Sequence, residues 1–352
     1  MFPRFLNSLP LLTCCAFGQE VSLNLENPKG TTKSESVVLS SLDWLARNQE
    51  PDGHWDAQLH GGQKGDDNAA TALAALCFFG MGETHLKAGP YKVNITRALD
   101  WLLARQDGEG ESRGQQPNWM YNHGISTLTL AEAYALTKDP KLRQPLEKMV
   151  AIIIQAQHPK HGTWDDLPVF HPRSSVSVWQ LMALSSARSA GIGIPGQPFE
   201  LASKWLDSIG AGEHGGLYGH GRGNDKTNAM VACGFFSRHL LGESPDTDRM
   251  LESARHLAAH PPNIQERDFH YWYFGSLALF KSQGKEWAAW NQNLRPIWLR
   301  LQEKEGKGAG SWPPCGDNHM GDKGRVISTA LATLSLEAYY RHLSMYLPQS
   351  GE

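Results

Sequence analysis

The chain has 352 residues and a formal net charge of -3 at pH 7, with 36 acidic residues against 33 Lys and Arg. That balance is ordinary for a globular protein and argues against nucleic acid as the main partner. After the N-terminal segment no apolar stretch reaches the length of about eighteen residues that spans a bilayer. We therefore expect no transmembrane segment in the mature chain.

The first residues have the pattern of an export signal. Arg4 supplies a basic region, residues 5–12 form an apolar region, and Ala16 and Gly18 are the small residues before a cleavage point. We expect a signal peptide over residues 1–18 and a chain exported to the periplasm or the cell exterior.

Cys14 and Cys15 raise a lipoprotein as the alternative, but Thr13 fits a lipid-attachment box poorly. The sequence does not decide whether either cysteine is lipidated. Residues 19–36 are polar and carry no hydrophobic period, which is typical of a linker.

From residue 37 to residue 345 two kinds of helix alternate. The first kind is amphipathic with one charged face, and the second is nearly apolar all round. Amphipathic helices are expected over residues 37–48, 95–105, 146–157, 199–208, 249–259 and 286–302, and apolar ones over 69–79, 124–136, 176–190, 229–241, 271–281 and 326–342. A helix with one apolar stripe lies on a surface, whereas a helix apolar on all sides is buried. The alternation predicts an all-α fold, the (α/α)6 toroid, with six inner and six outer helices.

A Gln–Gly–aromatic pattern follows several of the amphipathic helices and returns about every fifty residues, a period typical of stacked helical hairpins. None of these hairpins can bury its apolar face alone. The clearest copies are Gln49, Gly53 and Trp55, then Gln157, Gly162 and Trp164, then Gln302, Gly310 and Trp312.

These units, with the runs at residues 120–125, 178–184 and 271–275, resemble the repeats of squalene cyclases and of protein prenyltransferase β subunits. They also resemble a large bacterial group of prenyltransferase or squalene-oxidase repeat proteins. The resemblance implies the toroid fold strongly and an activity only weakly, because a fold does not fix chemistry. The ligand it implies is an apolar, isoprenoid-like lipid or small molecule in the central cavity.

The chain departs from those families at the residues that carry their chemistry. It has no Asp-x-Asp-Asp acid motif, so we expect no squalene cyclisation, and it has no clear zinc triad. Cys315 and His319 lie close in sequence but offer too few ligands for zinc. We expect no metal and no cofactor, and the sequence leaves open whether the protein is an enzyme.

The inner helices of a toroid direct their N-termini to one mouth, where free N–H groups and the helix dipole favour anionic groups. We therefore place the candidate site at residues next to or within the inner helices. The catalytic candidates are Asp67, His123, Asp268 and His270, and the ligand-binding candidates are Tyr121, Trp179, Tyr271, Trp272 and Arg325.

Each candidate also has an ordinary structural interpretation. Asp67 and Asp268 are suited to capping a helix, and His123 could be a hydrogen-bonded histidine at a loop junction. The aromatic residues could pack between the two rings, and Arg325 could pair with a loop acid.

Two classes of function remain open at this point. The first is an enzyme or binding protein for an isoprenoid-like ligand. The alternative is a non-isoprenoid toroid that binds a polysaccharide or a peptide, as a binding module or a lyase-like enzyme. A pocket dominated by Phe, Trp and Leu would favour the lipid, whereas Arg, Asp, His and Asn would favour the sugar or peptide. The sequence does not reveal a partner protein or the oligomeric state.

Overall fold

The computed structural model describes residues 32–108, 118–165, 173–221, 223, 226–314 and 323–338. Within these ranges the chain forms twelve α-helices, one short 3-10 helix η1 (Gly306–Gly308) and only isolated β-bridges. The all-α prediction is confirmed.

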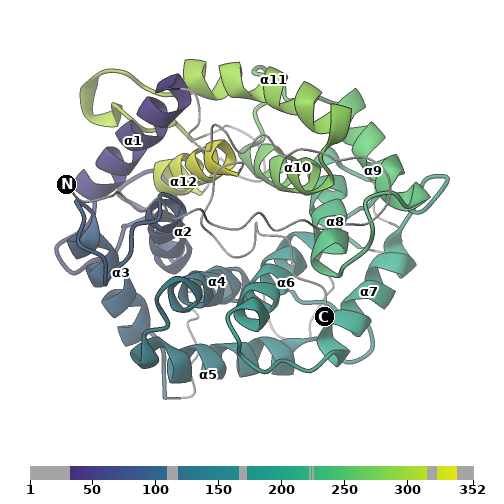
Figure 1. The fold of residues 1–352 in the computed structure, drawn as a ribbon, viewed down its shortest axis with the longest axis horizontal. Helices are drawn as coiled ribbons and strands as arrows, with labels where there is room; N and C mark the ends of the chain where they lie inside the picture. Colours follow the sequence, from purple (N-terminus) through teal and green to yellow (C-terminus); the bar gives the residue numbers. More distant parts are fainter. Residues whose placement is uncertain are drawn as a thin grey trace, which may run out of the picture.

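The helices form two concentric rings (Figure 1). The inner ring contains α2 (Asp67–Gly80), α4 (Trp119–Thr137), α6 (Ser174–Ser189), α8 (Asn228–Leu240), α10 (Phe269–Ser282) and α12 (Gly324–Glu337). The outer ring contains α1 (Thr32–Arg47), α3 (Lys92–Ala104), α5 (Pro140–Ala156), α7 (Gln197–Ile209), α9 (Asp248–Ala259) and α11 (Gly284–Leu301). Each inner helix packs against the next, and α12 packs against α2, so the inner ring is closed. This confirms the (α/α)6 toroid.

Some helices begin earlier than the apolar pattern predicts. Helix α1 starts at Thr32, within the expected polar linker, because the Nε of Arg295 on α11 donates a hydrogen bond of 2.7 Å to Ser34 Oγ and holds this polar turn. Helix α5 starts at Pro140, where the Asp139 side chain caps it and a proline at the first helical position costs no hydrogen bond. The expected extension of the last helix to residue 342 lies outside the described residues.

The repeated glutamine has one structural role in three copies. Its Nε2 donates to the carbonyl of the glycine in the following turn and to a carbonyl at the start of the next outer helix. Gln49 contacts Gly53 and Asn94 at 2.8 and 2.9 Å. Gln157 contacts Gly162 at 2.9 Å and Pro198 at 2.8 Å.

The repeated tryptophan is equally fixed. Trp55, Trp164 and Trp312 are buried, and each Nε1 donates to a carbonyl four residues before the repeated glutamine, at 2.8, 2.7 and 2.9 Å. The sequence period therefore marks the joints between hairpins.

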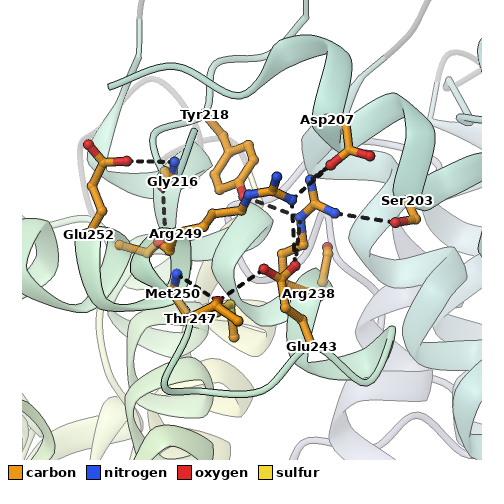
Figure 2. Close-up of polar contacts among 12 residues, drawn as sticks. Ser203, Asp207, Gly216, Tyr218, Arg238, Glu243, Thr247, Arg249, Met250 and Glu252 are labelled. Atoms are coloured by element: carbon orange, nitrogen blue, oxygen red, sulfur yellow. Dashed lines mark hydrogen bonds and ion pairs between the residues drawn. The ribbon is translucent and has the colours of Figure 1, made fainter. Parts of the chain in front are cut away.

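The joint between α7, α8 and α9 departs from this pattern. Gly210 occupies the glutamine position there, and an ion network replaces the amide (Figure 2). Arg238, almost fully buried, lies 2.7 Å from Asp207 on α7 and 3.3 Å from the Tyr218 hydroxyl. Asp207 also pairs with Arg249 on α9 at 2.8 Å. These charges connect three helices, which fits a structural role.

None of the helices in the described part of the chain combines the length and the apolar character that crossing a membrane requires.

Candidate functional site

The first turns of α2, α4 and α12 meet at a cluster centred on Asp66. This carboxylate is fully buried and accepts hydrogen bonds from Asn118 Nδ2 at 2.8 Å and from Lys323 Nζ at 2.9 Å. The same ammonium lies 4.9 Å from the centre of the Tyr121 ring, within cation–π range. These contacts show that the three inner helices begin at the same mouth.

Asp67 is half-buried beside this cluster, and its Oδ1 accepts a hydrogen bond of 2.9 Å from the Ala57 N–H. Burial raises the pKa of the Asp67 carboxyl above its usual value, and the nearby acids Asp56 and Asp66 add to that shift. Asp66 and Asp67 contact different partners, as neighbours on a helix start do. A raised pKa is what a general acid needs.

Aromatic side chains fill the interior of the ring between α4, α6 and α10. Trp179 on α6 stacks on Tyr273 of α10 with ring centroids 5.8 Å apart, and it meets Tyr121 edge-on at 6.1 Å. Phe274 lies 5.1 Å from Trp179. Trp179 is completely buried among these rings.

A cavity of about 950 Å³ opens at the first turns of α8 and α10. We call it the α8–α10 cavity. The segment between α9 and α10 forms one wall, and Ile297 of α11 contributes an apolar patch. Its polar and aromatic lining includes Asn228, His260, Asn263, Gln265, Glu266, Arg267, Asp268, Tyr271 and Trp272.

Three of the sequence-predicted residues meet at this cavity. Asp268 caps α10, and its Oδ1 accepts a hydrogen bond of 2.8 Å from the Tyr271 N–H. Tyr271 donates from its hydroxyl to the His260 carbonyl at 2.6 Å, and burial raises the pKa of this phenol. Trp272 also lines the cavity and is fully buried. Asp268 thus has both the expected capping role and a place in the lining.

His260, His256 and the segment between α9 and α10 are not among the candidates predicted from the sequence. The rings of His256 and His260 stack with centroids 4.3 Å apart, and His256 Nε2 lies 2.9 Å from Asn228 Oδ1. Burial, followed by the neighbouring His260, lowers the pKa of His256. Two histidines four residues apart at the end of α9 were the only signal in the sequence.

His123 does not lie at the mouth. It is fully buried within α4, and its Nε2 lies 3.0 Å from the Met149 carbonyl of α5. The α4 helix starts at Trp119 instead of residue 124, which carries His123 into the contact between the two rings. His270 is also buried, with its ring 4.7 Å from that of Phe274.

Arg325 makes the ion pair that the structural interpretation expected. Its Nη1 lies 2.8 Å from Glu303 Oε1 and 3.0 Å from Ser311 Oγ. Its backbone N–H donates to the His60 carbonyl at 2.8 Å. The guanidinium joins the start of α12 to the preceding loop, and ligand binding by Arg325 stays a prediction.

Within the described ranges no group of three or more His, Cys, Asp or Glu side chains could hold a metal ion. Cys315 and His319, like the signal-peptide region at residues 1–18, lie outside those ranges. Lipidation of Cys14 or Cys15, and export itself, therefore stay predictions.

No protein-family model matches the chain, and no curated protein matches it either. Solved structures do match its fold. An unsaturated glucuronyl hydrolase from Bacillus sp. GL1 matches with a TM-score of 0.65 and 14% identity, covering 90% of this chain and 100% of that one.

The α-1,6-mannanase GH76A of Salegentibacter sp. HEL1_6 matches with a TM-score of 0.61 and 12% identity, covering 87% of this chain and 98% of that one. That structure is an inactive variant with two consecutive aspartates replaced by asparagine, in complex with α-1,6-mannotriose. A glycosidase variant in complex with glucose matches with a TM-score of 0.58 and 12% identity, over 88% and 96% of the two chains.

At these identities the likeness shows the fold alone. The resemblance to squalene cyclases is right at the level of the toroid, but the neighbours are toroid glycosidases and do not support that specific family. An isoprenoid or other lipid ligand has no support from them.

Proposed function

We propose that this protein binds an oligosaccharide at the α8–α10 cavity. The lining of that cavity carries the proposal. Ligand pockets of about 300–1,000 Å³ are typical of small-molecule sites, and this cavity of about 950 Å³ lies within that range.

The lining also favours a sugar over an isoprenoid. Amide, imidazole, guanidinium and carboxylate groups from Asn228, His260, Arg267 and Asp268 border the cavity. An apolar chain would displace the water that solvates these groups, at a cost of about 1–3 kcal/mol for each buried polar atom left unsatisfied. The hydroxyls of a sugar can both donate to and accept from them.

The structural neighbours support the same class of ligand. Solved structures with this fold include complexes with α-1,6-mannotriose and with glucose. We therefore favour a sugar over an isoprenoid as the ligand. We still expect the chain to be exported.

The test is calorimetric titration of the purified protein with neutral and acidic oligosaccharides. Arg267→Ala should weaken binding about tenfold, a loss of about 1.4 kcal/mol. Arg255→Ala is the matched control, because Arg255 is an exposed arginine of α9 outside the lining. Absence of binding across the panel, or equal effects of the two substitutions, would reject the proposal.

Glycoside hydrolysis is the second candidate, favoured by the raised pKa of Asp67 beside the ion-paired Asp66. Glycosidases use one protonated and one ionised carboxyl. Asp67→Asn should abolish release of reducing sugar, while Asp165→Asn, in the other consecutive acid pair, should retain it. Activity that survives in Asp67→Asn would exclude this role.

A further inference from the structure

The imidazole of His260 is held in one tautomer by its own helix. Its Nδ1 lies 2.8 Å from the carbonyl oxygen of His256. A carbonyl only accepts, so Nδ1 must carry the hydrogen and act as the donor. In the neutral ring the other nitrogen, Nε2, is then left with a lone pair and is an acceptor.

Neighbouring contacts fix where this ring lies. The His256 ring stacks beneath it at 4.3 Å, and His256 is itself held because its Nε2 donates to Asn228 Oδ1 at 2.9 Å. The backbone of His260 is held separately, since its carbonyl accepts from the Tyr271 hydroxyl at 2.6 Å. Ring and backbone are therefore both anchored.

The remaining nitrogen faces no protein partner in the described part of the chain. His260 is an exposed residue, it lines the α8–α10 cavity, and no described hydrogen bond uses its Nε2. Arg267, Asn228 and the side-chain amides of the same wall bring donors to the cavity. Among these groups the Nε2 of His260, when it carries no hydrogen, is an acceptor with a fixed direction.

We propose that His260 Nε2 accepts a hydrogen bond from a hydroxyl of the bound sugar, and that Tyr271 is a positioning residue that holds His260 for this contact. The assignment rests on the proposed oligosaccharide binding. The His260 ring is already held in this orientation in the free protein, so binding the sugar costs little side-chain conformational entropy.

The experiment is a titration of the full chain with the tightest-binding oligosaccharide of the panel. His260→Ala should raise Kd about two- to twelvefold, the range for a net hydrogen bond of about 0.5–1.5 kcal/mol. Its Tm should stay close to that of the wild type, because the side chain is exposed. His214→Ala is the control for loss of an exposed histidine outside the lining, and it should leave Kd unchanged.

Tyr271→Phe tests the positioning role. Phenylalanine keeps the edge-on contact with Trp290, whose ring centroid lies 5.3 Å away, but it cannot donate to the His260 carbonyl. Kd should rise a few-fold in this variant. In the double variant with His260→Ala the two effects should not add, because both act on one contact. Additive losses would show that Tyr271 acts only on stability.

Nitrogen-15 NMR spectra of the histidine rings report the tautomer and hydrogen bonding of His260. A change in the stability of the protein alone would not alter them. The wild type should show His260 with its hydrogen on Nδ1, and saturation with the sugar should shift the Nε2 resonance. A hydrogen on Nε2 in the free protein would overturn the assignment. If the wild type binds sugars and His260→Ala binds them equally well, this inference fails while the proposed function stands. If the wild type binds none, both fail.

Discussion

Gln302 Nε2 donates a hydrogen bond of 2.8 Å to the carbonyl of Val37, and this contact joins the last outer helix to the first. The same amide donates to the Gly310 carbonyl at 2.9 Å. Gln49 and Gln157 make the corresponding contacts within the chain, so the joint that closes the ring has the chemistry of the joints that extend it. At the closing joint the first outer helix accepts, at Val37, the same glutamine bond that α3 accepts at Asn94 and α7 at Pro198.

Gln302→Leu should therefore destabilise the protein and loosen its closure. The substitution leaves two carbonyls without their buried donor, at a cost of about 1–3 kcal/mol each. Hydrogen exchange should quicken chiefly in α1. Gln157→Leu is the matched control, because it removes the same contacts from an internal joint and should quicken exchange in α7 instead. Equal exchange in α1 for both variants would contradict the closure role.

The sequence predicted the ring and missed parts of the site for definable physical reasons. The Gln–Gly–Trp pattern is a local signal, because Gln157 contacts Gly162 only five residues away. Where an inner helix begins is not local. Helix α4 begins at Trp119, directly after a polar run, and its first turns bury Asn122 and His123. In the sequence these two polar residues look like a continuation of that run, so His123 was placed before the helix.

The cavity shows the same limit. Asp268 was predictable because a capping aspartate stands directly before an apolar helix. The place of His260 depends on the Tyr271 hydroxyl, eleven residues away across a loop. No hydrophobic period in the sequence predicts that contact. A histidine at the end of an amphipathic helix is instead typical of a solvent-exposed surface position.

Gly162→Ala should be far more destabilising than Gly191→Ala. Both glycines have positive φ, +74° and +89°, which costs an L-residue about 1–2 kcal/mol. A Cβ on Gly162 would lie 2.3 Å from the Leu201 carbonyl oxygen, whereas one on Gly191 would meet nothing within 4 Å. Urea denaturation should show about 1 kcal/mol lost for Gly191→Ala and at least about twice that for Gly162→Ala. Equal losses would show that the hairpin joint can relax.

The protein should lose stability in mild acid through His239. Burial, reinforced by the nearby Lys281 charge, lowers the pKa of His239 to about 3, and its Nε2 lies 2.8 Å from Ser282 Oγ. The unfolded imidazole titrates near its ordinary value of 6.5. Between these values only the unfolded chain binds the proton, so stability falls as the pH falls from about 6.5 towards 3.

His239→Gln removes this titration and keeps a donor for Ser282. Urea midpoints measured from about pH 7 to about pH 4 should fall less steeply in His239→Gln than in the wild type. His214→Gln, at an exposed position, should follow the wild-type slope. A wild-type slope in His239→Gln would assign the acid sensitivity to other groups.

The joint between α6, α7 and α8 should contain one ordered water bound to Trp205. Trp44 occupies the matching position on α1, and its Nε1 donates to the Lys307 carbonyl at 3.0 Å. Trp205 is buried, and its Nε1 has no partner in the described part of the chain. Beside it lies a void of about 10 Å³ whose lining includes Ser177 and Ser237.

A void of about 10–15 Å³ with two or more polar partners is the smallest that holds a water. Such a water would accept a hydrogen bond from Trp205 Nε1 and donate one to a serine hydroxyl. It would take the place of the Lys307 carbonyl, which accepts from Trp44 Nε1 at the joint that closes the ring. A crystal structure at about 1.5 Å should show it about 2.9 Å from Nε1, and the same site should be empty in Trp205→Phe. An empty void in the wild type, or a protein atom that accepts from Trp205 Nε1, would contradict this assignment.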